Sequence, residues 1–364
     1  MKGLYTVSTQ VSDMARRRMK SKIQPAVTSL FLSPVGIQGQ QSETYYVDLS
    51  FIASLANRRF YRQGLNWAVA GIKIMTEVTD NQFNPASGTP TGKVTVSKVP
   101  TTWVASNAWE KGFRHWQKLN KMSGVPANTF TDFKVYLDEQ HYDYRNTTSR
   151  FLKPTALAMT GNALSRVGDW DYSKYVIPRA GSTSPGDAIE YDIMFVGDNY
   201  PNTKSVVSLI QGYANSRLIG ASAFIDPNRP GEMDDLMELR PENWLTAAFN
   251  EGTDQDHEVA ENLEQQNVQA PYAFENDTQG NTVTMYPGGQ SHLSGPQIHA
   301  IEPITGTTIG GTTYVNGGNF PCGLMRLDFD NTDSDTQKFM KAIIQIDLVP
   351  GDHRGYLAEP MTEM

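Results

Sequence analysis

The stretch LNWAVAGIKIMTEV, residues 65–78, is the strongest strand candidate in this sequence. It is rich in Val and Ile, and the residues that follow it, Thr79, Asp80 and Asn81, favour a turn. Similar segments recur on both sides of it. The further strand candidates are TYYVDLS (44–50), KVTVSKVPTTWV (93–104), FKVYL (133–137), YSKYVI (172–177), AIEYDIMFV (188–196), GLMRLDF (323–329) and FMKAIIQIDLV (339–349). The chain is therefore predicted to be rich in β-strands.

Two segments have helical spacing instead. NAWEKGFRHWQKLNKM (107–122) places Trp109, Phe113 and Trp116 on one face behind the N-cap candidate Asn107, and KSVVSLIQGYANSRLI (204–219) is the second. Helices and strands do not alternate regularly, which argues against a doubly wound α/β fold. Roughly eight to ten strands with long excursions predict an all-β fold with inserted helices, a single jelly roll formed as an antiparallel β-sandwich.

Composition agrees with that fold class. The 364 residues include 30 Gly and 20 Pro, and only 19% are charged, which favours short strands and long loops over a helical bundle. The single cysteine, Cys322, excludes an intrachain disulfide. No apolar stretch approaches the ~18 residues of a membrane span and no signal peptide pattern opens the chain, so membrane insertion is not expected.

Charge divides the chain into an arm and a body. Residues 1–25 contain six basic residues and one acidic residue, a net charge of +5, whereas the remaining 339 residues contain 25 basic and 38 acidic residues, a net charge of −13. The predicted organisation is a basic N-terminal arm over 1–40, partly flexible, a jelly-roll domain over 41–350 and a C-terminal tail over 351–364. A polar, acidic surface insertion is expected at about 226–270.

The basic run of the arm is the clearest functional signal. Five cations within seven residues can pair with phosphates of any nucleic acid in a salt-dependent way, without reading bases. The predicted nucleic-acid-binding residues are Arg16, Arg17, Arg18, Lys20 and Lys22. A solubilising tail and a nuclear-import signal are the alternative interpretations of the same run.

A second basic cluster follows the first strand candidate. Arg58, Arg59 and Arg62 are interleaved with Phe60 and Tyr61. Arginines with aromatic neighbours can grip a nucleic-acid strand, and the same residue types are enriched at the rims of subunit contacts. The sequence alone leaves both interpretations open.

The motifs of enzymes are absent from the sequence. No Walker A sequence, G-x-S-x-G elbow, H-E-x-x-H pair or Cys-x-x-Cys occurs. His141 lies beside Asp138, Glu139 and Asp143, but no nucleophile, phosphate cradle or metal motif accompanies it, and a polar loop is the expected structure. His292 and His299, and the four acids Asp328, Asp330, Asp333 and Asp335, are weak metal-site candidates without an EF-hand pattern. We expect a non-enzymatic protein with no cofactor and no metal.

Several of these segments together resemble a known family. The basic arm, ANRRFYRQGLNWAVAGIKI (56–74), TTWVASNAWEKGFRHWQKLNK (101–121), DFKVYLD (132–138) and GDWDYSKYVIP (168–178) resemble capsid proteins of circular Rep-encoding single-stranded DNA viruses of the divergent environmental type. The likeness covers roughly residues 10–200 and contains no single diagnostic motif. The arm of that family is longer and richer in Arg than the run Arg16–Lys22 that matches it here.

The resemblance implies a jelly-roll subunit that self-assembles into an icosahedral shell around single-stranded DNA. Its partners are then copies of itself, the nucleic acid and a host receptor of unknown identity, and its location is the virion, with the host nucleus as a station during assembly. A shell protein of a small RNA virus or phage is an alternative within the same class. A glycan-binding or adhesin-like β-sandwich that does not assemble is the alternative from another class, with exposed Trp or Tyr as the expected contacts.

Overall fold

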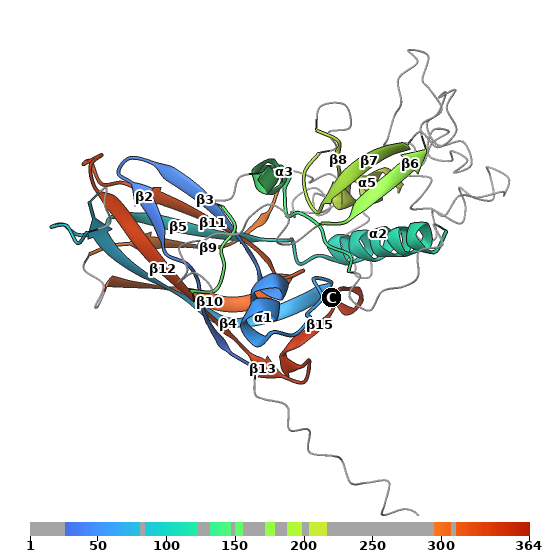
Figure 1. The fold of residues 1–364 in the computed structure, drawn as a ribbon, viewed down its shortest axis with the longest axis horizontal. Helices are drawn as coiled ribbons and strands as arrows, with labels where there is room; N and C mark the ends of the chain where they lie inside the picture. The colour runs from blue at the N-terminus through green and yellow to red at the C-terminus, as the bar shows by residue number, and fades with distance from the viewer. Residues whose placement is uncertain are drawn as a thin grey trace, which may run out of the picture.

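The computed structural model describes residues 26–80, 84–122, 132–146, 150–155, 172–178, 188–198, 204–216, 295–306 and 311–364. Within these ranges the chain is mostly antiparallel β-strand with few helices, which confirms the predicted β-rich class (Figure 1). The predicted surface insertion at 226–270 lies outside the described residues, as does the basic run of the arm.

Two large sheets form the body. The first has the strand order β1, β12, β4, β10, with β2 also paired to β12 and β15 also paired to β4. Its strands are β1 (Ser29–Phe31), β2 (Val35–Gln38), β4 (Leu65–Thr79), β10 (Thr312–Pro321), β12 (Phe339–Leu348) and β15 (Ala358–Pro360). The second has the order β3, β11, β5, β9. Its strands are β3 (Ser42–Asp48), β5 (Gly92–Lys98), β9 (Gln297–Ile304) and β11 (Leu324–Asn331). We call these two facing sheets the sandwich.

The strand pairs of the sandwich are nested along the sequence. β1 and β2 pair with β12, β3 pairs with β11, β4 pairs with β10, and β5 pairs with β9, all antiparallel. The outermost pair joins residues far apart in the chain, since Ser29 lies opposite Asp347. The first four strand positions along the chain therefore pair, in reverse order, with the last four. Residues 99–296 lie between β5 and β9 in the sequence.

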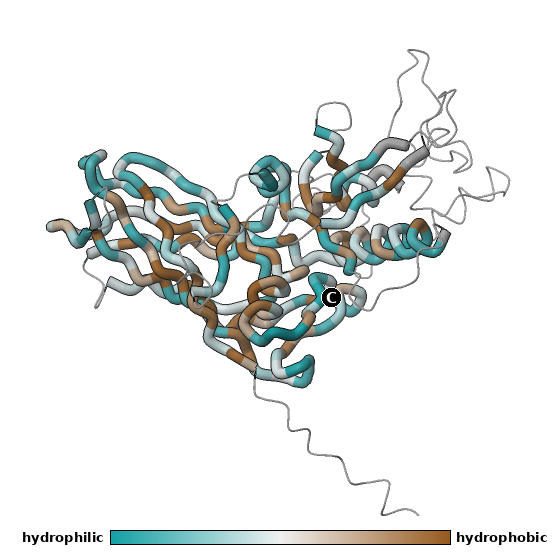
Figure 2. Tube along the Cα trace, viewed as in Figure 1, coloured by the Kyte–Doolittle hydropathy of each residue, from teal (hydrophilic) through white to brown (hydrophobic). Residues whose placement is uncertain are grey.

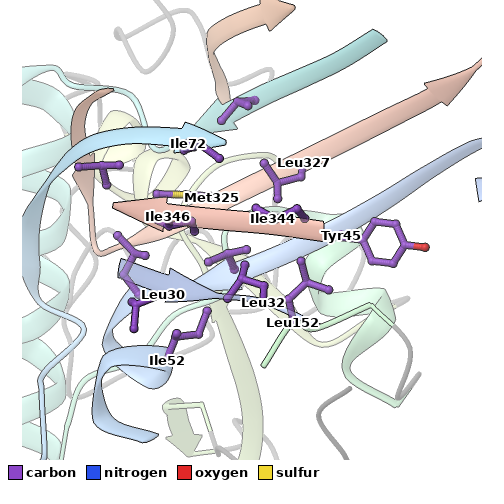
Figure 3. Packing of buried hydrophobic residues seen from close by; sticks show 14 of the residues in the cluster. Leu30, Leu32, Tyr45, Ile52, Ile72, Leu152, Met325, Leu327, Ile344 and Ile346 are labelled. Atoms are coloured by element: carbon purple, nitrogen blue, oxygen red, sulfur yellow. The ribbon is translucent and has the colours of Figure 1, made fainter. Parts of the chain in front are cut away.

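Inward-facing side chains of both sheets share one hydrophobic core (Figure 3). On β4, Ile72 and Ile74 are fully buried while Lys73 between them is partly exposed, and on β12 the buried Ile344 and Ile346 alternate with partly exposed neighbours in the same way. This alternation follows from the two-residue repeat of a strand. Figure 2 shows hydrophilic residues in the turns at the left end of the sandwich and hydrophobic residues along its strands.

Helix α1 (Leu49–Asn57) connects the two sheets between β3 and β4. It begins because the Asp48 carboxylate accepts hydrogen bonds from the backbone N–H groups of Ser50 (2.9 Å) and Phe51 (3.2 Å). It ends at Arg58, whose backbone is left-handed with φ 53° and whose N–H donates to the Ser54 carbonyl. This turn sends the chain across to the start of β4.

The segment between β5 and β9 forms a second lobe beside one end of the sandwich (Figure 1). Its elements are α2 (Trp103–Met122), α3 (Glu139–Asp143), η2 (Tyr144–Asn146), β6 (Lys174–Pro178), β7 (Ala188–Met194), β8 (Val206–Ser208) and α5 (Leu209–Ser216). The predicted aromatic face of α2 packs here, because Trp109, Phe113 and Trp116 belong to the second hydrophobic cluster. Gly112 lets the helix approach closely, since a Cβ there would lie 2.5 Å from Leu209.

Three predicted boundaries in and next to this lobe are wrong. The strand predicted over 93–104 ends at Lys98, and α2 begins at Trp103 rather than at Asn107. Pro100 interrupts the strand pattern, and the Thr102 hydroxyl oxygen then accepts the Ala105 N–H (3.3 Å) at the start of the helix. The helix predicted over 204–219 begins with the strand β8, which pairs in parallel with β7.

Both ends of the described body differ from the predicted arm and tail. Residues 26–40 are not part of an arm, because β1 and β2 belong to the first sheet. Residues 351–364 are not a tail: the remaining strands β13 (Pro350–Gly351) and β14 (Gly355–Tyr356) form a hairpin, β15 pairs with β4, and η4 (Met361–Glu363) follows. Tyr356 and Met361 are fully buried, so their apolar surface stabilises the sandwich and the second lobe.

Candidate nucleic-acid interface at the root of the arm

The predicted nucleic-acid-binding residues, Arg16–Lys22, lie outside the described residues. What the structure fixes is the point at which the arm meets the body. The Val27 N–H donates to the Asn57 side-chain oxygen (2.9 Å), and the Tyr356 hydroxyl donates to the Val27 carbonyl (2.6 Å). The Asn57 amide in turn donates to the Tyr356 hydroxyl (2.6 Å). The root of the arm is therefore held between the end of α1 and the β13–β14 hairpin.

Four arginines belong to the two segments that hold this root. Arg58, Arg59 and Arg62 follow α1, and Arg354 lies in the β13–β14 hairpin. The hairpin and the segment after α1 are joined directly, because the Arg354 guanidinium donates to the Phe60 carbonyl and the Tyr61 hydroxyl donates to the Arg354 carbonyl (3.1 Å). We call these four residues the arginine cluster. Arg354 was missed from sequence because nothing local connects it to residues 58–62.

The two aromatic residues within the cluster have different roles. Tyr61 is fully buried and packs on Trp67 and Tyr356, and burial raises its pKa although nearby Arg59 and Arg354 oppose that shift. Phe60 is only partly buried, and the Arg62 guanidinium lies 5.4 Å from the centre of its ring. Arg62 also reaches Asp132 at 3.7 Å. Of the two rings, Phe60 is thus the more accessible to solvent.

His141, the one candidate for acid–base chemistry, is part of the packing between the sandwich and the second lobe. Its ring is buried and stacks on Tyr46, with ring centres 4.3 Å apart. Its Nδ1 accepts the Leu137 N–H (2.9 Å), and burial lowers its pKa to about 3. A fully buried, neutral ring with these contacts has a structural explanation.

Asp138, the carboxylate near His141, also has structural partners. Asp138 caps α3 through the His141 N–H (2.8 Å), accepts the Tyr46 hydroxyl (2.8 Å) and pairs with Arg326 (2.8 Å). Arg326 additionally pairs with Asp328 (2.9 Å) on its own strand. Since Arg326 belongs to β11 and Asp138 to the second lobe, this network joins the lobe to the second sheet.

A second buried polar network joins residues on both sides of α1 in the sequence to the second lobe. The Gln63 amide donates to Asp48 (3.0 Å) and to the Val135 carbonyl (3.2 Å), and its oxygen accepts the Val135 N–H (2.6 Å). The Gln63 N–H donates to Asp132 (2.9 Å). Burial raises the pKa of both Asp48 and Asp132. Gln63 therefore satisfies buried polar groups on both sides of the junction.

The weak metal-site candidates are separate in the structure. Asp330 pairs with Lys93 (3.5 Å) and Asp335 with Lys338 (3.5 Å), while the Asp333 carboxylate accepts the Asp335 N–H (3.0 Å) within a turn. His299 contacts the Asn316 carbonyl (2.9 Å) across the edge of the sandwich, and His292 lies outside the described residues. In the described part of the chain, no three His, Cys, Asp or Glu side chains gather as metal ligands would.

The described tryptophans are packing residues. Trp67 is fully buried, Trp109 is 5% exposed, and Trp103 and Trp116 pack against the second hydrophobic cluster. Trp170 and Trp244 lie outside the described residues. The most exposed large aromatic side chain within them is Tyr314 on β10, at 63%.

Comparison with known proteins adds no assignment. No family model, no curated protein and no solved structure matches this chain. Among the described helices, none combines the length and the apolar character that crossing a membrane requires.

Proposed function

We propose that this chain is a viral capsid subunit that self-assembles into an icosahedral shell and packages single-stranded nucleic acid, DNA on the family resemblance, through its basic arm. The observation that carries the proposal is the nested strand order. Counting β1 and β2 together as the first strand, the sheets have the orders 1-8-3-6 and 2-7-4-5. A long eight-stranded hairpin rolled into two facing sheets gives these orders, and eight strands in two Greek keys define a jelly roll.

Jelly rolls occur in viral shells, lectins and cupins, so the fold alone does not decide between these classes of protein. The distribution of charge favours a shell. A +5 leader precedes a body of net charge −13, which suits a subunit that holds a polyanion on one side and keeps particles apart on the other. The virion is accordingly the proposed location, and the host nucleus is a proposed site during assembly.

Expression of the full chain tests this proposal. We expect closed shells by electron microscopy and an absorbance ratio at 260 over 280 nm that indicates nucleic acid. Replacing Arg16, Arg17, Arg18, Lys20 and Lys22 by Gln is expected to lower that ratio more than it lowers the yield of shells, because it removes cations that can pair with phosphates and changes no residue of the described strands. A monomer that carries no nucleic acid under all salt conditions would contradict the proposal.

The glycan-binding alternative has one observation in its favour. Tyr314 is exposed on the outer face of the first sheet, with Lys73 5.7 Å from the centre of its ring. That alternative predicts no shells and a loss of glycan binding in Tyr314→Ala. Because Tyr314 lies on an edge strand away from the core, this substitution tests binding without unfolding the protein.

A further inference from the structure

We infer that the contact of the α3 segment, residues 138–146 with α3 and η2, with strands β3 and β11 is released by acid. The segment separates from these strands increasingly often as the pH falls below about 6.5, while the sandwich stays folded. This local opening of the native protein does not depend on what the protein binds, and it lies outside the proposed function.

The side chain of His141 holds the α3 segment against four other segments. It is 1% exposed, and its ring stacks on Tyr46 of β3. The rings of Tyr136, Phe151 and Tyr172 have their centres 5.3, 4.9 and 5.6 Å from the centre of the histidine ring. Because β3 supplies one face of this enclosure, separation of the segment from β3 brings the His141 ring into water.

Hydrogen bonds keep the enclosed ring neutral. Since Nδ1 accepts the Leu137 N–H (2.9 Å), the ring proton is assigned to Nε2, which lies 3.4 Å from the Tyr172 hydroxyl oxygen. A second proton would have to enter at Nδ1, where it would displace the Leu137 N–H and bury a charge. Burial accordingly lowers the pKa of His141. The ring in water has its ordinary pKa of about 6.5, so acid favours the open form.

The charged groups around the ring are engaged elsewhere. One oxygen of Asp138 accepts the His141 backbone N–H and the Tyr46 hydroxyl, and the other pairs with Arg326 of β11 (2.8 Å). The other charged side chains of the segment and its neighbours also have partners: Glu139 and Asp143 pair with Lys204, Arg145 lies over Tyr142, and Arg150 pairs with Glu43. Within the described residues, no carboxylate forms an ion pair with the His141 ring that would stabilise its charged form.

The sandwich does not use the α3 segment to fill its own core. Among the described side chains, the core of the sandwich includes none from residues 138–146. The buried Tyr142 belongs to a separate small cluster with Tyr136, Met194 and Val206. Opening of the segment therefore leaves the core between the two sheets covered, which is the condition for a local rather than a global transition.

Hydrogen exchange in the full chain, followed by mass spectrometry, measures the opening. Each exchange rate is divided by the intrinsic rate at the same pH. The protection of peptide 138–146 should then fall about 30-fold from pH 7.5 to pH 5.0, because the open form takes up a proton with a pKa of about 6.5. This exchange should change little in dilute urea, since a local opening exposes little surface. Exchange in β12 should respond to urea through global unfolding.

Two variants assign the effect to His141. H141N keeps an acceptor for the Leu137 N–H and cannot titrate in this range, so it should remove the pH dependence of protection. Y46F retains the histidine and removes the hydrogen bond to Asp138. It should raise the opening equilibrium at both pH values by the same factor and keep the about 30-fold change between them.

The native chain alone can overturn the inference. A change in protection of less than about threefold between the two pH values would do so without any variant. An α3 segment with the protection and the urea response of β12 would do so as well, because its opening would then be global unfolding. A pH dependence in H141N equal to that of the native chain would assign the effect to another group and reject the role of His141.

Discussion

Acidification should weaken the junction between the sandwich and the second lobe through His141. Its ring is buried against Tyr46, and Nδ1 already accepts the Leu137 N–H, so a proton there would break that bond and bury a charge. The folded-state pKa of about 3 lies below the ordinary value of about 6.5. Folding therefore favours the neutral ring, and this contribution to stability is present above about pH 6.5 and is lost as the pH falls toward 3.

The magnitude follows from linkage. Between pH 7.5 and pH 5.0 the unfolded chain takes up a proton at this histidine while the folded chain does not, which costs about 2 kcal/mol of unfolding free energy. His141→Asn keeps an acceptor for the Leu137 N–H and cannot titrate in this range. The variant should be less stable than the native chain at pH 7.5, because it loses the stack on Tyr46, but it should lose about 2 kcal/mol less on acidification.

Urea unfolding followed by tryptophan fluorescence at the two pH values measures this difference. Tyr46→Phe is the matched control, since it removes the hydrogen bond to Asp138 at the same junction and retains the histidine. It should lower stability at both pH values and leave the pH dependence as in the native chain. Equal losses in the native chain and in His141→Asn would refute the reasoning.

Three other outcomes test the packing. Gln63→Ala should cost about 2–4 kcal/mol in urea unfolding, because Asp48 and the Val135 N–H lose a buried partner, whereas the exposed Gln40→Ala should cost far less. Deleting residues 351–364 should abolish soluble expression, since it removes Tyr356 and Met361 from the two cores; a soluble product with the native melting temperature would show that the segment is dispensable. Cys322 should not react with a chromogenic disulfide reagent in the native state at pH 8 and should react fully in urea, because burial raises its pKa; rapid native reaction would contradict its placement.

Local sequence patterns predicted those parts of the fold that depend on neighbouring residues. The Val and Ile content of residues 65–78 and the turn residues after them identified β4, and the aromatic spacing of residues 109–116 identified the buried face of α2. The boundaries failed where a cap competed with a strand pattern, as at Thr102. The sequence also separated a cationic leader from an acidic body, because net charge requires no knowledge of contacts.

Only the tertiary structure shows which strands pair with one another. Ser29 pairs with Asp347 across 318 positions of sequence, and a two-residue repeat states which face is buried without stating what covers it. The arginine cluster arose in the same way, since Arg354 reaches residues 58–62 only because Tyr356 is buried beside Tyr61. The spacing of apolar residues and the charge of each segment can be read from the sequence because they depend only on local residues. The pairing of distant segments depends on which arrangement buries the apolar faces of all of them at once.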